Sequence, residues 1–344
     1  MKNKNSAPSI EQWGKLYEIA AQIKQLAPWD NLYDTDLFTI MLPGRDEPAF
    51  VSVMGRAGEC YGIGVYPGFK PLLGMRRLIE CPMDSMLANP LSFQDCMMCY
   101  YGDREEIEHP DREVMKALDL KFRGKNNWIY FRVMEPGYLP WFLNAEQADL
   151  LTEILQNFVE AYTDYISGKL EIDFENGETL IRKYSSEKEE WTNEAAPSPP
   201  IPMEIEELQF KDELLLKRLK NSPKTKIELE LDILYLPTPV QDKKDEKPYF
   251  PRFIMLADHK TGQPLFQNLM PSDIENRNAA ISVLVNYINE HGKPAKLHLR
   301  DKFFAPHVDS FCEQVGIKAV YKGVDAIDDF AEQLMRLMGG GFDF

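Results

Sequence analysis

The sequence lacks any apolar stretch of about 18 residues, the length that a membrane-spanning helix requires. Residues Met1 to Gln12 are polar and contain no apolar signal core. The five cysteines are an odd number in a chain of 344 residues, which does not fit a disulfide scaffold. These absences argue against a membrane protein and a disulfide-stabilised secreted protein, and they predict a cytoplasmic protein without a membrane partner.

Positive charge is scarce: the chain has 39 Lys and Arg but 55 Asp and Glu, which gives a net charge of −16. Residues 221–344 have a balance of only −3, so residues 1–220 carry the remaining −13. An acidic surface repels phosphate backbones. Nucleic acid is therefore disfavoured as a partner of the N-terminal part and left open for the C-terminal part. Solubility alone also accounts for the excess.

Common catalytic signatures are absent as well. The chain has no glycine-rich phosphate loop and no dinucleotide fingerprint, and no histidine stands in a triad-like context beside Ser or Cys. Cys96 and Cys99 form a CxxC with Cys81 upstream, whereas a zinc site needs four ligands within tetrahedral reach. If residues 91–101 form a strand, the two CxxC thiols point to opposite faces. We interpret the thiols as structural, and keep zinc at Cys81, Cys96 and Cys99 and redox chemistry as alternatives.

A segment rich in charge and proline, residues 185–202, predicts a boundary between two domains. It ends with four prolines in six residues, a composition typical of a linker. Residues 1–184 are then an N-terminal domain and residues 203–344 a C-terminal domain, as the chain length suggests.

The N-terminal domain is predicted to be α+β. Ser9 and Gln12 form a capping box at the start of its first helix. Three strand-like segments, 37–42, 49–56 and 60–66, are separated by Gly, Pro and Asp turns, which indicates an antiparallel meander. A long helix over 145–166 begins at Asn144 and has a continuous apolar stripe.

The C-terminal domain is predicted to be α/β with the element order βββαβαβα and a mixed sheet. Its first strand, 226–236, alternates apolar residues with Glu228, Glu230 and Asp232, so one face is buried and the other carries carboxylates. The fourth strand, 296–300, is expected to lie beside the first, with Asp301 in the turn that follows it. The carboxylate face is expected to be solvated unless it holds a site.

Four motifs of the N-terminal domain resemble an uncharacterised bacterial domain family without an assigned activity. They are Trp29-Asp-Asn-Leu-Tyr-Asp34, Val53-Met-Gly55 with Tyr61-Gly62, Lys121-Phe-Arg-Gly124 and Pro136-Gly-Tyr-Leu-Pro-Trp141. The resemblance implies a bacterial source and no mechanism. Core and turn packing explains these aromatic residues, and the alternative is a groove for a partner or small ligand lined by Trp29, Tyr33, Tyr138 and Trp141.

The C-terminal domain resembles ribonuclease-H-like domains of the integrase and transposase type. The resemblance rests on the element order, on Glu230-Leu-Asp-Ile-Leu-Tyr235 and on Lys293-Pro-Ala-Lys-Leu-His-Leu-Arg-Asp301. It implies that Asp232, Asp301 and a late carboxylate such as Asp328 would hold Mg²⁺ or Mn²⁺ for phosphoryl transfer. The third carboxylate is not unique, because Asp325, Asp329 and Glu332 lie nearby, and basic residues are not concentrated around either aspartate.

The sequence therefore favours a non-catalytic module that binds an unknown protein or a small ligand and needs no cofactor. The alternative is a Mg²⁺- or Mn²⁺-dependent nuclease, and only in that case is a metal cofactor expected.

Overall fold

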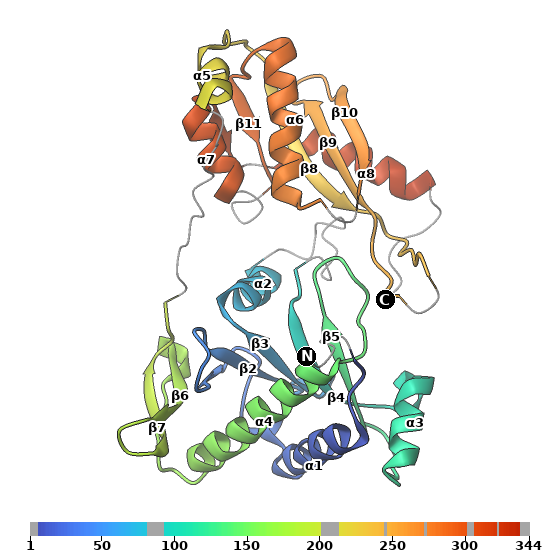
Figure 1. The fold of residues 1–344 in the computed structure, drawn as a ribbon, viewed down its shortest axis with the longest axis vertical. Coiled ribbons are helices and arrows are strands. Elements are labelled where there is room, and N and C mark those ends of the chain that lie inside the picture. Colours follow the sequence, from blue (N-terminus) through green and yellow to red (C-terminus); the bar gives the residue numbers. More distant parts are fainter. Residues whose placement is uncertain are drawn as a thin grey trace. The chain divides into compact units, whose positions relative to one another are not determined.

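The computed structural model describes residues 6–80, 93–200, 213–243, 246–271, 274–300, 306–321 and 323–337. The chain divides into two compact units (Figure 1). The first comprises Met1–Glu80, Phe93–Pro136 and Pro140–Pro202, and the second Cys81–Ser92, Gly137–Leu139 and Met203–Phe344. None of the helices in the described part of the chain combines the length and apolar character that a membrane crossing requires. Both units mix helices with a sheet, so the α+β class predicted from the sequence is confirmed.

A seven-stranded sheet forms the centre of the first unit. In spatial order its strands are β5 (Trp128–Met134), β4 (Cys96–Gly102), β3 (Gly62–Pro67), β2 (Ala49–Met54), β1 (Phe38–Met41), β6 (Glu178–Ser185) and β7 (Glu190–Pro197). Strands β1 to β5 are antiparallel neighbours in chain order, and only β1 and β6 are parallel. The predicted three-stranded meander corresponds to β1, β2 and β3.

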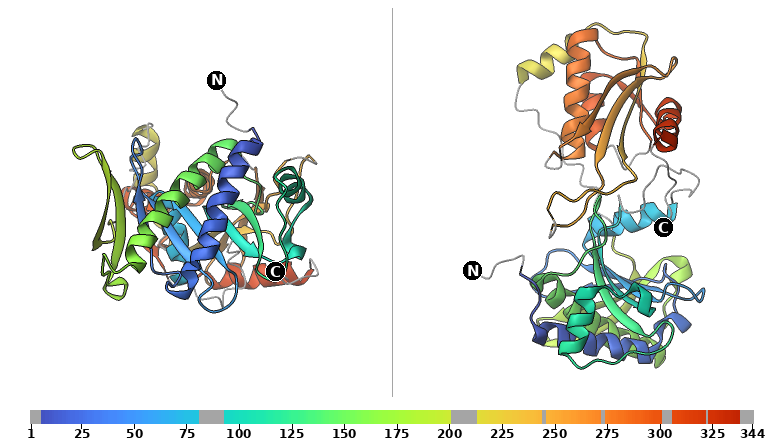
Figure 2. Two further views of the ribbon diagram at one scale, coloured as in Figure 1. Left: turned by 90° about the horizontal axis from the view of Figure 1, so that it is seen from below. Right: turned by 90° about the vertical axis from the view of Figure 1, so that its right-hand side faces the viewer.

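Two long helices, α1 (Ile10–Leu26) and α4 (Ala145–Ile166), pack together against one face of this sheet (Figures 1 and 2). Both begin as predicted, at Ser9 and at Asn144. Ser9 pairs with Gln12 in the predicted capping box, and Asn144 forms a second reciprocal capping box with Gln147. The apolar stripe of α4 is buried against the sheet, so the hydrophobic effect holds the helix in place. Two further helices of this unit are α2 (Phe69–Glu80) and α3 (His109–Ala117).

Strand β7 corrects the predicted linker. Residues 190–197 pair with β6 along its whole length, from Glu178 opposite Pro197 to Ser185 opposite Glu190. The segment is polar and ends in proline, so it has no apolar pattern of its own. Cross-strand pairing orders it, with Arg182 of β6 stacked over Trp191 and bonded to Asn193.

The second unit contains a five-stranded mixed sheet. In spatial order its strands are β10 (Pro264–Met270), β9 (Arg252–Asp258), β8 (Glu228–Tyr235), β11 (Lys296–His298) and β12 (Lys318–Val320). Strands β8 to β10 are antiparallel, whereas β11 lies parallel to both β8 and β12. The first and fourth strands of the unit are thus neighbours, as the sequence predicted.

Helices cover both faces of this second sheet. The helices on one face are α5 (Glu213–Asn221), α6 (Asn276–His291) and α7 (Pro306–Val315), which pack on Leu229, Leu231 and Leu297. Helix α8 (Asp325–Leu337) lies on the other face, where Ile327 and Ala331 pack on strand residues (Figure 2, right). The face of β8 that carries the carboxylates is therefore covered by a helix.

Candidate functional site

Three carboxylates of β8, on Glu228, Glu230 and Asp232, share one face of the second sheet, because side chains alternate along a strand. The expectation of a solvated face is wrong: Glu230 is fully buried and Asp232 is 3 % exposed. Helix α8 begins over them, and the backbone N–H of Ile327 donates to Glu230 Oε2 at 3.1 Å. Buried carboxylates need partners, so the groups that neutralise them define the site.

Arg300, just after β11, is the partner of Asp232. Its Nε and Nη2 atoms both lie 2.7 Å from Asp232 Oδ2, and Nη2 also donates to Asp328 Oδ1 at 2.7 Å. The remaining oxygen of Asp232 accepts from the N–H of Ile233 at 2.9 Å. The guanidinium therefore joins β8, β11 and the first turn of α8.

Burial and pairing act in opposite directions on this ion pair. Burial is the largest influence on Asp232 and raises its pKa, whereas the charge of Arg300 and its hydrogen bond lower it. Burial lowers the pKa of Arg300, but the carboxylates of Asp232 and Asp328 outweigh this, so the pKa of Arg300 stands above its ordinary value. Arg300 is consequently a permanent cation between two acidic groups.

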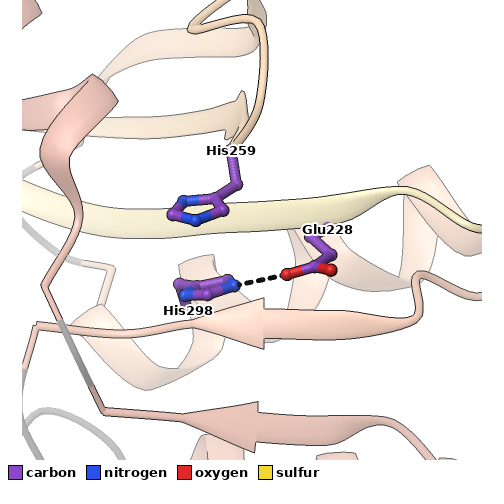
Figure 3. A group of neighbouring side chains, drawn as sticks. All are labelled: Glu228, His259 and His298. Carbon is purple, nitrogen blue, oxygen red and sulfur yellow. Dashed lines mark hydrogen bonds and ion pairs between the residues drawn. The ribbon is translucent and has the colours of Figure 1, made fainter.

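A second polar cluster lies at the other end of β8 (Figure 3). His259 follows β9, His298 ends β11, and their rings stack with centroids 3.8 Å apart and an interplanar angle of 13°. His298 Nε2 lies 3.0 Å from Glu228 Oε2, and His259 Nδ1 lies 2.5 Å from Glu230 Oε1. Within the described residues, Glu228, His259 and His298 are the one group whose ligand atoms come close enough to hold a metal, all within 4.8 Å of one another.

The residues proposed for a nuclease are partly brought together. Asp232 and Asp328 share Arg300. Leu297 and Leu299 enter the apolar core, whereas His298 and Arg300 face the carboxylates. Asp301 lies outside the described residues, so its distance from Asp232 remains to be measured.

The four aromatic residues proposed for a groove are distributed over both units. Trp29 packs on Tyr61 and Tyr101, with ring centroids 5.2 and 5.1 Å apart. Tyr33 is 55 % exposed and lies against Arg56.

Trp141, also in the first unit, pairs through its backbone with Val133 in β5 and contacts the ring of Phe142. Tyr138 belongs to the second unit, where it pairs with Tyr249. Trp29 and Trp141 thus have packing roles, and in the described structure Tyr33 is the most exposed of the four.

The CxxC thiols are buried in β4. Burial raises the pKa of Cys96 and of Cys99 to about 12, so neither is a reactive thiolate at neutral pH. They stand three residues apart on one strand and therefore project to opposite faces. Cys81, the third proposed zinc ligand, lies outside the described residues.

Two family models match parts of the chain. Residues 13–182 match the family model of a domain of unknown function, DUF7309, and residues 215–335 match that of a second, DUF6930. The N-terminal part is therefore similar to an uncharacterised domain family, as its motifs predicted, and the C-terminal part is similar to a second one. Among proteins with curated functions, none matches the chain. The kinship with ribonuclease-H-like domains is not confirmed by these matches.

Sequence reasoning missed the two stacked histidines, which lie 39 positions apart in the chain. One signal could have found them. His298 lies in the predicted fourth strand, which was expected beside the first, and His259 directly follows β9, which the structure shows paired with the first strand, β8. Strand pairing places both rings over the glutamates of β8.

Proposed function

We propose that the protein is a non-catalytic binding module whose second unit takes up an extended segment of a partner protein along strand β10. Support comes from the character of this strand. β10 is the outermost strand of its sheet, and its first six residues are exposed. Leu265, Phe266 and Leu269 are 41 %, 39 % and 56 % exposed, and no residue of Pro264–Met270 carries a charge.

Such an edge is unusual for an isolated protein. Native sheets protect exposed edges with charges, prolines in the strand or short length, because unpaired backbone groups attract another strand. In the described part of the chain no strand pairs with the outer edge of β10, and Pro264 stands at its first position rather than inside it. An extended partner segment would satisfy the free backbone groups and cover the apolar side chains.

The acidic residues of the same sheet support a binding role rather than catalysis. A two-metal nuclease needs carboxylates that are free to hold divalent cations. Here Arg300 places its own positive charge between Asp232 and Asp328 and donates to both. The arrangement pairs Asp232 and one oxygen of Asp328 with an internal cation. The cytoplasmic location predicted from the sequence fits such a module.

Peptide selection tests the proposal without knowledge of the natural partner. A random-peptide phage library is panned on the full chain, and the affinity of each selected peptide is measured by fluorescence anisotropy. Leu269→Lys and Phe266→Lys should each weaken binding at least tenfold, because a charge blocks strand addition. Leu214→Lys is the matched control, since Leu214 is an 81 % exposed leucine on α5 and should not affect binding.

Two outcomes contradict this proposal. One is a library that yields no peptide, and the other is a set of peptides that bind both β10 variants as well as the unmodified chain. Circular dichroism melts of each variant establish that the sheet is intact, so a loss of binding is not mistaken for a loss of fold.

The nuclease alternative has its own test. The full chain is incubated with Mn²⁺ and either single- or double-stranded DNA, beside the variant Asp232→Asn. We expect no cleavage in either sample. Mn²⁺-dependent cleavage that disappears in Asp232→Asn would establish the alternative instead.

A further inference from the structure

We infer that Glu228, His259 and His298 form a binding site for a divalent transition-metal ion of the zinc class. This site is independent of strand addition along β10. Two imidazoles and a carboxylate are the ligand types that zinc binds in three-ligand protein sites, with a fourth position left for water or an external group.

Strand pairing places the three ligands on adjacent strands. In the register of β8 and β11, Glu228 stands opposite Lys296 and Glu230 opposite His298. The backbone N–H of His259 donates to the Glu228 carbonyl at 2.9 Å, which fixes the start of the β9–β10 loop beside β8. Two strand ends, at Glu228 and His298, and the first residue after a third strand, His259, therefore carry the ligands.

Glu230 prepares His259 for metal binding. It is fully buried, receives the Ile327 N–H at 3.1 Å, and holds His259 Nδ1 at 2.5 Å. A carboxylate only accepts hydrogen bonds, so the Nδ1 atom carries the proton and Nε2 keeps its lone pair. Metal-binding histidines commonly donate their other ring nitrogen to a carboxylate in this way.

The surroundings favour a dication. Glu228 and Glu230 bring two carboxylates to the cluster. Lys296 lies 3.1 Å from both oxygens of Glu228, and Lys260 adds a weaker positive influence on the same carboxylate. The side chain of Lys296 is 39 % exposed, so it can turn towards water when a metal takes its place. His259 is 28 % exposed at its side chain, which leaves an entry path from solvent.

Metal binding requires a small closure of the cluster. Ligand atoms bound to one zinc ion at about 2.0–2.2 Å lie roughly 3.5 Å apart. One ring nitrogen of each histidine and one oxygen of Glu228 lie within 4.8 Å of one another, and the histidine rings are nearly parallel. The His259 ring must therefore tilt out of the stack to bring its Nε2 atom to a shared metal, and its position in a hairpin loop permits this.

Zinc titration of the full chain tests the inference. The background is Cys60→Ser with Cys81→Ser, so that these thiols do not contribute, and Zn²⁺ binding is followed by calorimetry. We expect one Zn²⁺ per chain, a Co²⁺ complex with a tetrahedral ligand-field spectrum, and at least tenfold weaker binding in His259→Ala and in His298→Ala. Glu230→Gln should weaken binding about 10- to 100-fold, because the amide no longer fixes the tautomer.

His291→Ala is the matched control, because His291 also contacts a glutamate, Glu290 at 3.6 Å, but stands outside the cluster. Its Zn²⁺ affinity should equal that of the background chain. The inference is overturned if the background chain binds no Zn²⁺, or if the double variant His259→Ala, His298→Ala keeps the affinity. Zinc that is lost only when Cys96 and Cys99 are replaced would assign the metal to the thiols instead.

Discussion

Replacing Arg300 with methionine should destabilise the second unit strongly. The change removes the guanidinium that pairs with Asp232 and Asp328 while keeping much of the apolar stem. Asp232, whose side chain is 5 % exposed, is then left as a buried carboxylate with one remaining donor, the Ile233 N–H. The prediction follows because an unpaired buried charge costs far more than the pair itself contributes.

The magnitude comes almost entirely from Asp232. Removal of one partner of a buried ion pair typically costs about 3–5 kcal/mol. Asp328 is 35 % exposed, so water replaces much of its interaction and its share is about 1 kcal/mol or less. We therefore expect Arg300→Met to lower the free energy of unfolding by about 3–5 kcal/mol at pH 7, and Asp328→Asn to lower it by about 1 kcal/mol or less.

The loss should depend on pH. Without Arg300, burial raises the pKa of Asp232 further, so the folded protein holds a proton that the unfolded chain releases above about pH 4. The penalty is therefore absent at low pH and grows as pH rises from about 4 towards the raised pKa. Urea denaturation should show a smaller difference between variant and unmodified chain at pH 4 than at pH 7.

A double variant separates charge from packing. Arg300→Met with Asp232→Leu replaces both polar partners by apolar groups and should recover most of the stability. The reasoning is refuted if Arg300→Met costs no more than Asp328→Asn, or if the double variant is as unstable as the single one.

Further predictions concern the core of each unit. Ellman's reagent at pH 8 should modify exposed Cys60 much faster than the buried thiols of the folded chain. At a pKa of about 12 only about one in 10,000 buried thiols is ionised at this pH, so rapid labelling of a buried thiol would contradict the prediction. The buried thiols are Cys96, Cys99 and Cys312. Gly292→Ala should cost about 1–3 kcal/mol in a urea melt, because its φ is +86° and a Cβ would lie 2.6 Å from the Pro223 carbonyl oxygen; an unchanged midpoint would exclude this strain. Asp111→Ala should lower the free energy of unfolding by about 3–5 kcal/mol, because it leaves the buried guanidinium of Arg132 without its partner at 2.8 Å. A decrease below about 1 kcal/mol would show that the exposed Glu108 is a sufficient partner for Arg132.

Local sequence signals predicted much of the fold. Asn144 at the N-terminus and the apolar stripe behind it located α4, and alternation along β8 identified which residues share a face. Alternation does not tell what covers a face. The carboxylates of β8 were expected in water, but helix α8 covers them. This helix lies about 100 residues further along the chain and is positioned by tertiary packing of residues such as Ile327, which local alternation does not indicate.

The failures share a physical cause, which is that non-local contacts supply the order. Strand β7 has a linker's composition and becomes a strand through its pairing with β6. His259 and His298 have no local motif, and no local pattern links Arg300 to Asp232. Composition and periodicity describe a segment, whereas these interactions depend on which strands become neighbours.

Hydrogen exchange of the β10 amides tests the proposed binding mode most directly. Exchange is measured by mass spectrometry on the full chain, alone and saturated with a selected peptide. Strand addition predicts slower exchange within residues 264–270 on binding, because backbone groups on the outer edge acquire partners. Protection confined to other segments, with exchange in 264–270 unchanged, would contradict it.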